Sequence, residues 1–63
     1  MNEPTNDYEE LVLALTLSII APTEEKSKQC VSMAEELATK LSEIEVERAK
    51  REAMKKAEEM QLN

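Results

Sequence analysis

The residues of this sequence that could carry chemistry are few and lack the partners that catalysis needs. Cys30 is the only cysteine, and the chain has no histidine. Hydroxyl groups such as those of Thr16, Ser18 and Ser32 need a neighbouring base to become nucleophiles, and no imidazole can supply one. We therefore expect no catalytic residue and no enzymatic activity.

Acidic pairs are the remaining candidates for a reactive centre. Glu43 and Glu47 stand four residues apart, which places both on one face of a helix. Di-metal centres in helical bundles complete their ligand set with Glu-x-x-His motifs, which this chain cannot form. We expect solvated charge at these positions, with no metal and no cofactor. Cys30 falls on an apolar helix face, so we expect it to pack as a small apolar side chain.

The charge distribution excludes one class of partner and indicates another. The net charge is −6, which would repel the phosphates of a nucleic acid. A locally basic stretch nevertheless lies between residues 48 and 56. We take four of its side chains as a candidate surface for a protein partner: Arg48, Lys50, Arg51 and Lys55.

The apolar segment Leu11–Ala21 does not indicate a membrane protein. It is about 11 residues long, whereas a bilayer-spanning helix needs about 20. Its flank is acidic, the reverse of the basic region that opens a signal peptide. A single thiol fits a reducing compartment. We expect no membrane partner and a cytoplasmic location.

The sequence indicates an all-α fold in a single domain over residues 1–63. The chain has no glycine, and its two prolines lie at or before residue 22. Asn6 is a good N-cap, Pro22 should end the first helix, and Thr23 should cap the next. We predict a frayed lead-in over residues 1–6, a short helix over 7–20, a turn over 21–23 and one long helix over 24–60. The short turn makes the two helices an antiparallel hairpin.

The short helix is apolar on two opposite faces. At 100° per residue, Leu11, Leu15 and Ile19 fall on one stripe, whereas Leu13 and Leu17 fall on another. One helix of the same chain can cover one stripe, so the other needs a second molecule. We therefore predict a homo-oligomer, most simply a two-fold dimer. Its predicted interface residues are Leu11, Leu13, Leu15, Leu17, Ile19, Ile20, Leu37, Leu41 and Ile44.

The long helix changes character after Ile44. Before this residue, apolar side chains recur at spacings of three and four, as packed helices require. Beyond it, a weaker stripe of Val46, Ala49, Ala53 and Ala57 is rotated by more than about 100° from the first. We therefore expect a dimeric four-helix bundle from which the end of the second helix protrudes as a partly solvated arm.

Residues 13–30 have the sequence LALTLSIIAPTEEKSKQC, and the segment Met33–Ala38 follows them. In these residues the chain resembles small uncharacterised helical proteins encoded by cyanobacterial viruses. The resemblance implies an accessory protein of the host cytoplasm and carries no active site. The plan of a short helix and a long helix is also similar to the small dimeric phycobilisome-degradation proteins. Their aromatic and leucine-rich contact pattern is absent here, so their activity is not carried over.

Three functions fit these features. The first is a non-enzymatic homo-oligomeric interaction protein, such as a virus-encoded adaptor or modulator of a host protein. The second is a purely structural unit, in which the arms bind further copies of the chain. The third is an acidic mimic that blocks a nucleic-acid-binding protein, which the basic side chains between Arg48 and Lys56 disfavour.

Overall fold

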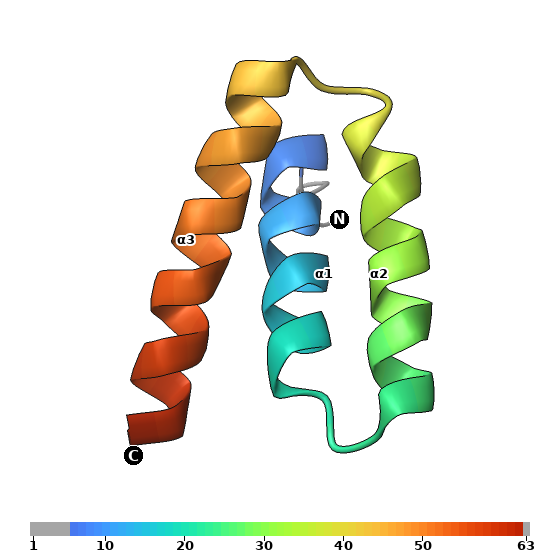
Figure 1. Cartoon of the computed structure of the whole chain (residues 1–63). Helices are drawn as coiled ribbons and strands as arrows, with labels where there is room; N and C mark the ends of the chain where they lie inside the picture. Colours follow the sequence, from blue (N-terminus) through green and yellow to red (C-terminus); the bar gives the residue numbers. More distant parts are fainter. Residues whose placement is uncertain (1–5, 63) are drawn as a thin grey trace, which may run out of the picture.

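The computed structural model describes residues 6–62, and within them the chain forms three α-helices and no strand. These are α1 (Asp7–Ile20), α2 (Glu24–Ala38) and α3 (Glu43–Leu62) (Figure 1). The predicted all-α class is therefore confirmed. Of the predicted lead-in, Met1–Thr5 lies outside the described residues.

The first helix has the bounds that its flanking residues indicate. The side chain of Asn6 accepts a hydrogen bond from the backbone N–H of Glu9 at 2.7 Å. Ala21, which precedes Pro22, leaves the helix with φ −59° and ψ 140°. The hydroxyl of Thr23 then accepts from the backbone N–H of Lys26 at 3.2 Å and opens α2. Asn6 thus caps the start of α1, Pro22 ends this helix, and Thr23 caps the start of α2.

The prediction of one continuous helix over residues 24–60 is wrong, because the chain breaks between Ala38 and Glu43. Ser42 and Glu45 form a capping box at the start of α3. The Ser42 backbone N–H donates to Glu45 Oε1 at 3.0 Å, and the Glu45 N–H donates to Ser42 Oγ at 3.2 Å. These bonds satisfy backbone groups that a helix start otherwise leaves unpaired. The helix can therefore begin anew without glycine or proline.

The predicted protruding arm is also wrong, because α3 folds back along α1. The side chains of Ala49, Ala53 and Ala57 are 0%, 0% and 2% exposed. In one continuous helix, the apolar stripes before and after Ile44 would point in different directions, so only one of them could face α1. The break at residues 39–42 reorients the chain, and the second stripe therefore also packs on α1.

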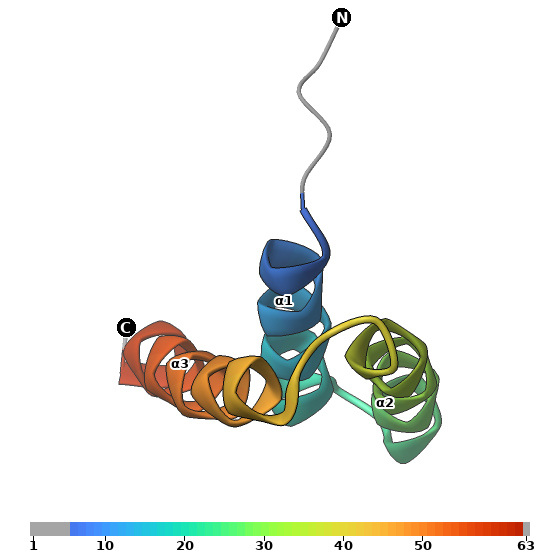
Figure 2. The same ribbon diagram turned by 90° about the horizontal axis from the view of Figure 1, so that it is seen from above.

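The three helices form an open arrangement with α1 in contact with both of the others. α1 packs against α2 on one side and α3 on the other, whereas α2 and α3 barely touch (Figure 1). Viewed from above, α2 and α3 lie apart, with α1 reaching between them (Figure 2). A closed three-helix bundle would bury the whole inner surface of each helix, but here part of α1 stays uncovered on two sides.

The core is small and rich in alanine. Its buried members are Leu11, Val12, Ala14, Ala34, Ala49 and Ala53. Leu11 is the largest side chain that is fully buried, at 1% exposure. The one buried polar side chain among the described residues, Thr16, donates its hydroxyl to the carbonyl of Val12 at 2.7 Å. This core leaves little apolar burial to hold the helices together.

Candidate interaction surfaces

The first candidate site is an apolar surface between α1 and α2, which we call the α1 face. Leu13 and Leu17 of α1 are 59% and 41% exposed, and Met33 of α2 is equally open to solvent at 58%. With Ala14 and the half-buried Leu37 they line a hollow of about 330 Å³. Glu9 and Glu10 border its end nearest the start of α1. The α1 face is therefore an apolar patch with an acidic border.

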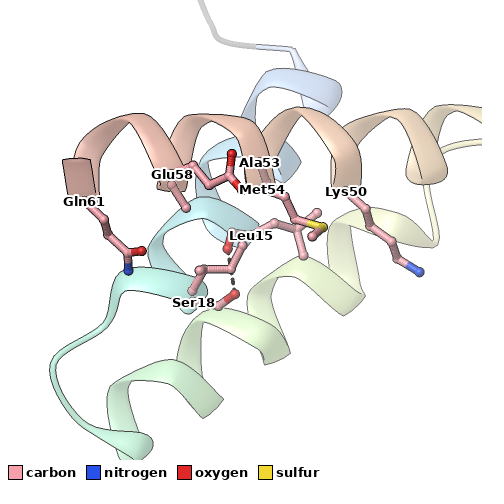
Figure 3. Close-up of a pocket in the computed structure, with 9 residues that line it drawn as sticks. Leu15, Ser18, Lys50, Ala53, Met54, Glu58 and Gln61 are labelled. Carbon is pink, nitrogen blue, oxygen red and sulfur yellow. Dashed lines mark hydrogen bonds between the residues drawn. The ribbon is translucent and has the colours of Figure 1, made fainter.

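The second candidate site lies between α1 and α3, and we call it the α1–α3 groove. Its volume is about 510 Å³. Its apolar wall consists of Leu15, Ile19, Ala53, Met54 and Ala57. Figure 3 shows Lys50, Met54, Glu58 and Gln61 on α3, with Leu15 and Ser18 contributed by α1. The remaining wall of the groove is polar: Ser18, Lys50, Glu58 and Gln61.

The two surfaces lie on opposite sides of α1. At 100° per residue, the direction shared by Leu13 and Leu17 differs by about 160° from that shared by Leu15 and Ile19. A molecule bound at one surface therefore leaves the other free.

Two hydroxyl groups form hydrogen bonds near the turn between α1 and α2. The hydroxyl of Ser18 donates to the carbonyl of Leu15 at 2.7 Å. The hydroxyl of Ser27 in α2 donates to the carbonyl of Ser18 at 2.8 Å and joins the two helices.

The predicted interface residues do not all lie on these surfaces. Leu11 is buried by its own chain, so its burial needs no second molecule. Ile44 is 74% exposed and lies on α3 beside Arg48 and Arg51, away from both surfaces. Leu41 lies half-buried near the start of α3. The structure brings Leu13, Leu17 and Leu37 together on the α1 face, and Leu15 and Ile19 together in the α1–α3 groove. Ile20 is half-buried.

The four basic side chains of the candidate partner surface are exposed, and three of them share one face of α3. Lys50 lines the α1–α3 groove, and its Nζ lies 3.7 Å from an Oε2 of Glu47. Arg48 and Arg51 line a shallow hollow with Ile44. Lys55 belongs to neither site. Arg48, Arg51 and Lys55 recur at spacings of three and four, so they lie within about 60° of one another on α3, whereas Lys50 lies about 100–160° away from them. The basic partner surface therefore stays a prediction, with three of its four residues on one face.

Sequence reasoning did not single out Met54, which lines the groove and is 61% exposed. The available signal was its position. Met54 lies four residues from both Lys50 and Glu58, which puts the three side chains on one helix face. It is also adjacent in sequence to Ala53, which packs on α1.

A hydrogen bond between two side chains joins α1 to α3. The Tyr8 hydroxyl donates to Glu52 Oε1 at 2.6 Å and joins α1 to α3. This hydrogen bond raises the pKa of Tyr8, and desolvation and the negative charge of Glu52 add to the effect, while Arg48 opposes it.

Cys30 is half-buried with a free thiol. Across residues 6–62, no three Cys, Asp or Glu side chains gather to hold a metal ion.

Two further observations complete the description. None of the helices, over the part of the chain that the structure describes, combines the length and apolarity needed to cross a membrane. Comparison with protein-family models, curated proteins and solved structures finds no match to this chain. The α1 face and the α1–α3 groove are therefore the features from which a function can be inferred.

Proposed function

We propose that this chain is a non-enzymatic interaction protein that self-associates through the α1 face. In the proposed two-fold dimer, α1 and α2 of two copies form a four-helix bundle, with α3 on the outside of each copy. The observation that carries the proposal is the exposure of Leu13 and Leu17, because neither α2 nor α3 covers them. Met33 and Leu37 extend the same surface onto α2.

The energetics support association. Burying a leucine or methionine side chain fully contributes about 1.5–3 kcal/mol. A chain of this length gains only about 3–5 kcal/mol from its own core unless something staples it. Leu11 is the only large side chain fully buried among the described residues, so the core is small even for this length. Covering the α1 face would therefore add a large fraction of the total stability.

The proposed role of the dimer is to act as an adaptor or modulator of another protein. Pairing through the α1 face leaves two α1–α3 grooves, one on each copy, facing away from the dimer interface. The resemblance to small proteins of cyanobacterial viruses implies that this other protein belongs to the host cytoplasm. The acidic-mimic function gains no support, because Arg48, Arg51 and Lys55 interrupt the negative charge along α3.

A purely structural assembly unit is the second candidate function, and one observation favours it. The α1–α3 groove lies on the opposite side of α1 from the α1 face. A chain with two self-binding surfaces on opposite sides grows beyond a dimer, whereas a chain with one stops there. The mass reached at high concentration therefore separates the two functions.

The proposal is tested by replacing Leu17 with glutamate. Leu17 is 41% exposed in the single chain, so Leu17→Glu should keep the helical circular dichroism spectrum. In the dimer, the new carboxylate would be buried without a partner charge, which costs roughly several kcal/mol. At micromolar concentration, we expect the mass by sedimentation to fall from two chains to one.

The matched control is Ile44→Glu, which makes the same change on α3 away from both surfaces. It should leave the mass unchanged. A folded Leu17→Glu protein with the mass of the natural chain would reject the α1 face as the self-association surface.

A further inference from the structure

The α1–α3 groove carries a pattern of charge along α3 that is complementary to itself. Residues 47, 50, 54, 58 and 61 recur at spacings of three and four, so they share one helix face. Lys50, Met54, Glu58 and Gln61 on this face all line the groove. Met54 is at the centre, with a basic side chain one turn before it and an acidic side chain one turn after it.

We propose that a second copy of this chain occupies the groove, with the two α3 helices packed antiparallel about a two-fold axis at Met54. Residues equally distant from Met54 then face each other. Lys50 lies opposite Glu58 of the partner subunit, and Glu47 lies opposite Gln61 of the partner subunit. The two-fold axis repeats each pair, so the contact contains two ion pairs between opposite charges.

A parallel arrangement of the two helices does not fit. It would place Lys50 opposite Lys50 of the partner subunit and Glu58 opposite Glu58 of the partner subunit. Like charges across a helix contact are destabilising. The charge order along α3 therefore selects the antiparallel arrangement, and electrostatic complementarity fixes its register.

The apolar residues of the groove fit the same contact. Met54 would meet Met54 of the partner subunit on the axis and cover Ile19, which is 45% exposed in the single chain. Among the described residues of one chain, Lys50 pairs with Glu47 at 3.7 Å, and both side chains are more than half exposed. Such an exposed pair contributes little. Lys50 can therefore exchange it for a partner across the axis at low cost.

This contact goes beyond the proposed dimer. It lies on the other side of α1 from the α1 face, so both contacts can form at once. Two two-fold contacts on opposite sides of a chain join dimers into larger assemblies. The α3–α3 contact is thus the second contact that a structural assembly unit needs.

Charge exchange tests the register. By sedimentation at low salt, the mass of the natural chain should grow beyond a dimer between micromolar and millimolar concentration. Lys50→Glu alone and Glu58→Lys alone should each abolish this growth, because each places like charges opposite one another. The double exchange should restore it. Lys55→Glu, an equal change of charge on a different face of α3, should leave the growth intact.

A cross-linking experiment tests the axis independently. In a Cys30→Ser background, Met54→Cys places two thiols on the two-fold axis, and oxidation should link two chains. Lys55→Cys in the same background should not link them, because its side chain points away from the axis.

The outcomes separate this inference from the proposed function. A natural chain that remains a dimer at millimolar concentration, and that Leu17→Glu reduces to one chain, overturns the α3 contact and leaves the α1-face dimer standing. A natural chain that is a single copy throughout overturns both. Growth that the double exchange does not restore, or equal cross-linking by both cysteine variants, rejects the antiparallel register about Met54.

Discussion

The two helices that flank α1 contact it through different kinds of side chain. α2 combines the buried Ala34 with the larger, half-buried Leu37, and Leu41 follows in the connection to α3. α3 packs mainly through Ala49, Ala53 and Ala57. Small residues let two helices approach closely but bury little apolar area. The contact with α3 is therefore close and made mainly of small side chains, with half-buried Val46 as a larger member, whereas the contact with α2 includes the larger Leu37.

Because the side chains that pack α3 against α1 are mainly small, a helix cap and a hydrogen bond also help to hold α3 in place. The capping box of Ser42 and Glu45 sets where α3 begins, and the Tyr8–Glu52 hydrogen bond joins it to α1. Because local stability follows the contacts that a helix makes, we expect loss of either feature to raise amide exchange in α3.

The largest expected effect comes from enlarging the alanine stripe. Ala53→Leu places a bulky side chain where α3 touches α1 at 0% exposure. Overpacking of this kind costs about 1–3 kcal/mol. Chemical denaturation should show this loss, and hydrogen exchange should show it concentrated in α3. Lys55→Leu on the exposed side of the helix should change the free energy of unfolding by less than about 0.5 kcal/mol. Equal stability of the two variants would mean that α3 is not closely packed.

Removing the start signal of α3 should have a smaller effect. Ser42→Ala deletes the hydroxyl that caps the helix, and the loss of an N-cap costs about 1 kcal/mol. Helical content by circular dichroism should fall, with amide exchange rising in the first turns of α3. Ser32→Ala, in the exposed middle of α2, is the matched control, and it should neither lower the helical content nor raise the exchange in α3. Unchanged exchange in Ser42→Ala would show that the break at residues 39–42 does not depend on this cap.

The smallest expected effect concerns Tyr8. Its hydrogen bond to Glu52 raises the pKa of Tyr8 in the folded chain. The stabilisation is therefore fully present below the unfolded pKa of about 10 and is lost as the pH rises through the higher folded value. Thermal melts of the natural chain and of Tyr8→Phe should differ at neutral pH and converge in strong alkali. A difference that persists unchanged at high pH would show that the hydroxyl does not stabilise the fold.

The sequence predicted α1 well because strong local signals flank it. Asn6 and Thr23 supply side-chain caps, and Pro22 forces Ala21 out of the helix. The break between α2 and α3 escaped prediction because no glycine or proline marks it. Two weaker signals were present: the Ser42–Glu45 capping box and the rotation of the apolar stripe near Ile44. Considered together, they indicate a new helix.

The candidate surfaces were predicted only in part. The two apolar stripes of α1 were visible from the spacing of its leucines, but the number of helices covering them was not. Leu11 was predicted to face a second molecule, whereas its own chain buries it once α3 folds back. The groove beside Met54 could not be predicted, because it exists only where α3 returns alongside α1.

Sedimentation equilibrium of the natural chain across a dilution series is the decisive measurement, because the uncovered α1 face should require a second copy. With a chain mass of 7.2 kDa, we predict a mass of at least two chains at micromolar concentration. A folded, helical protein with the mass of one chain at the same concentration would contradict the account.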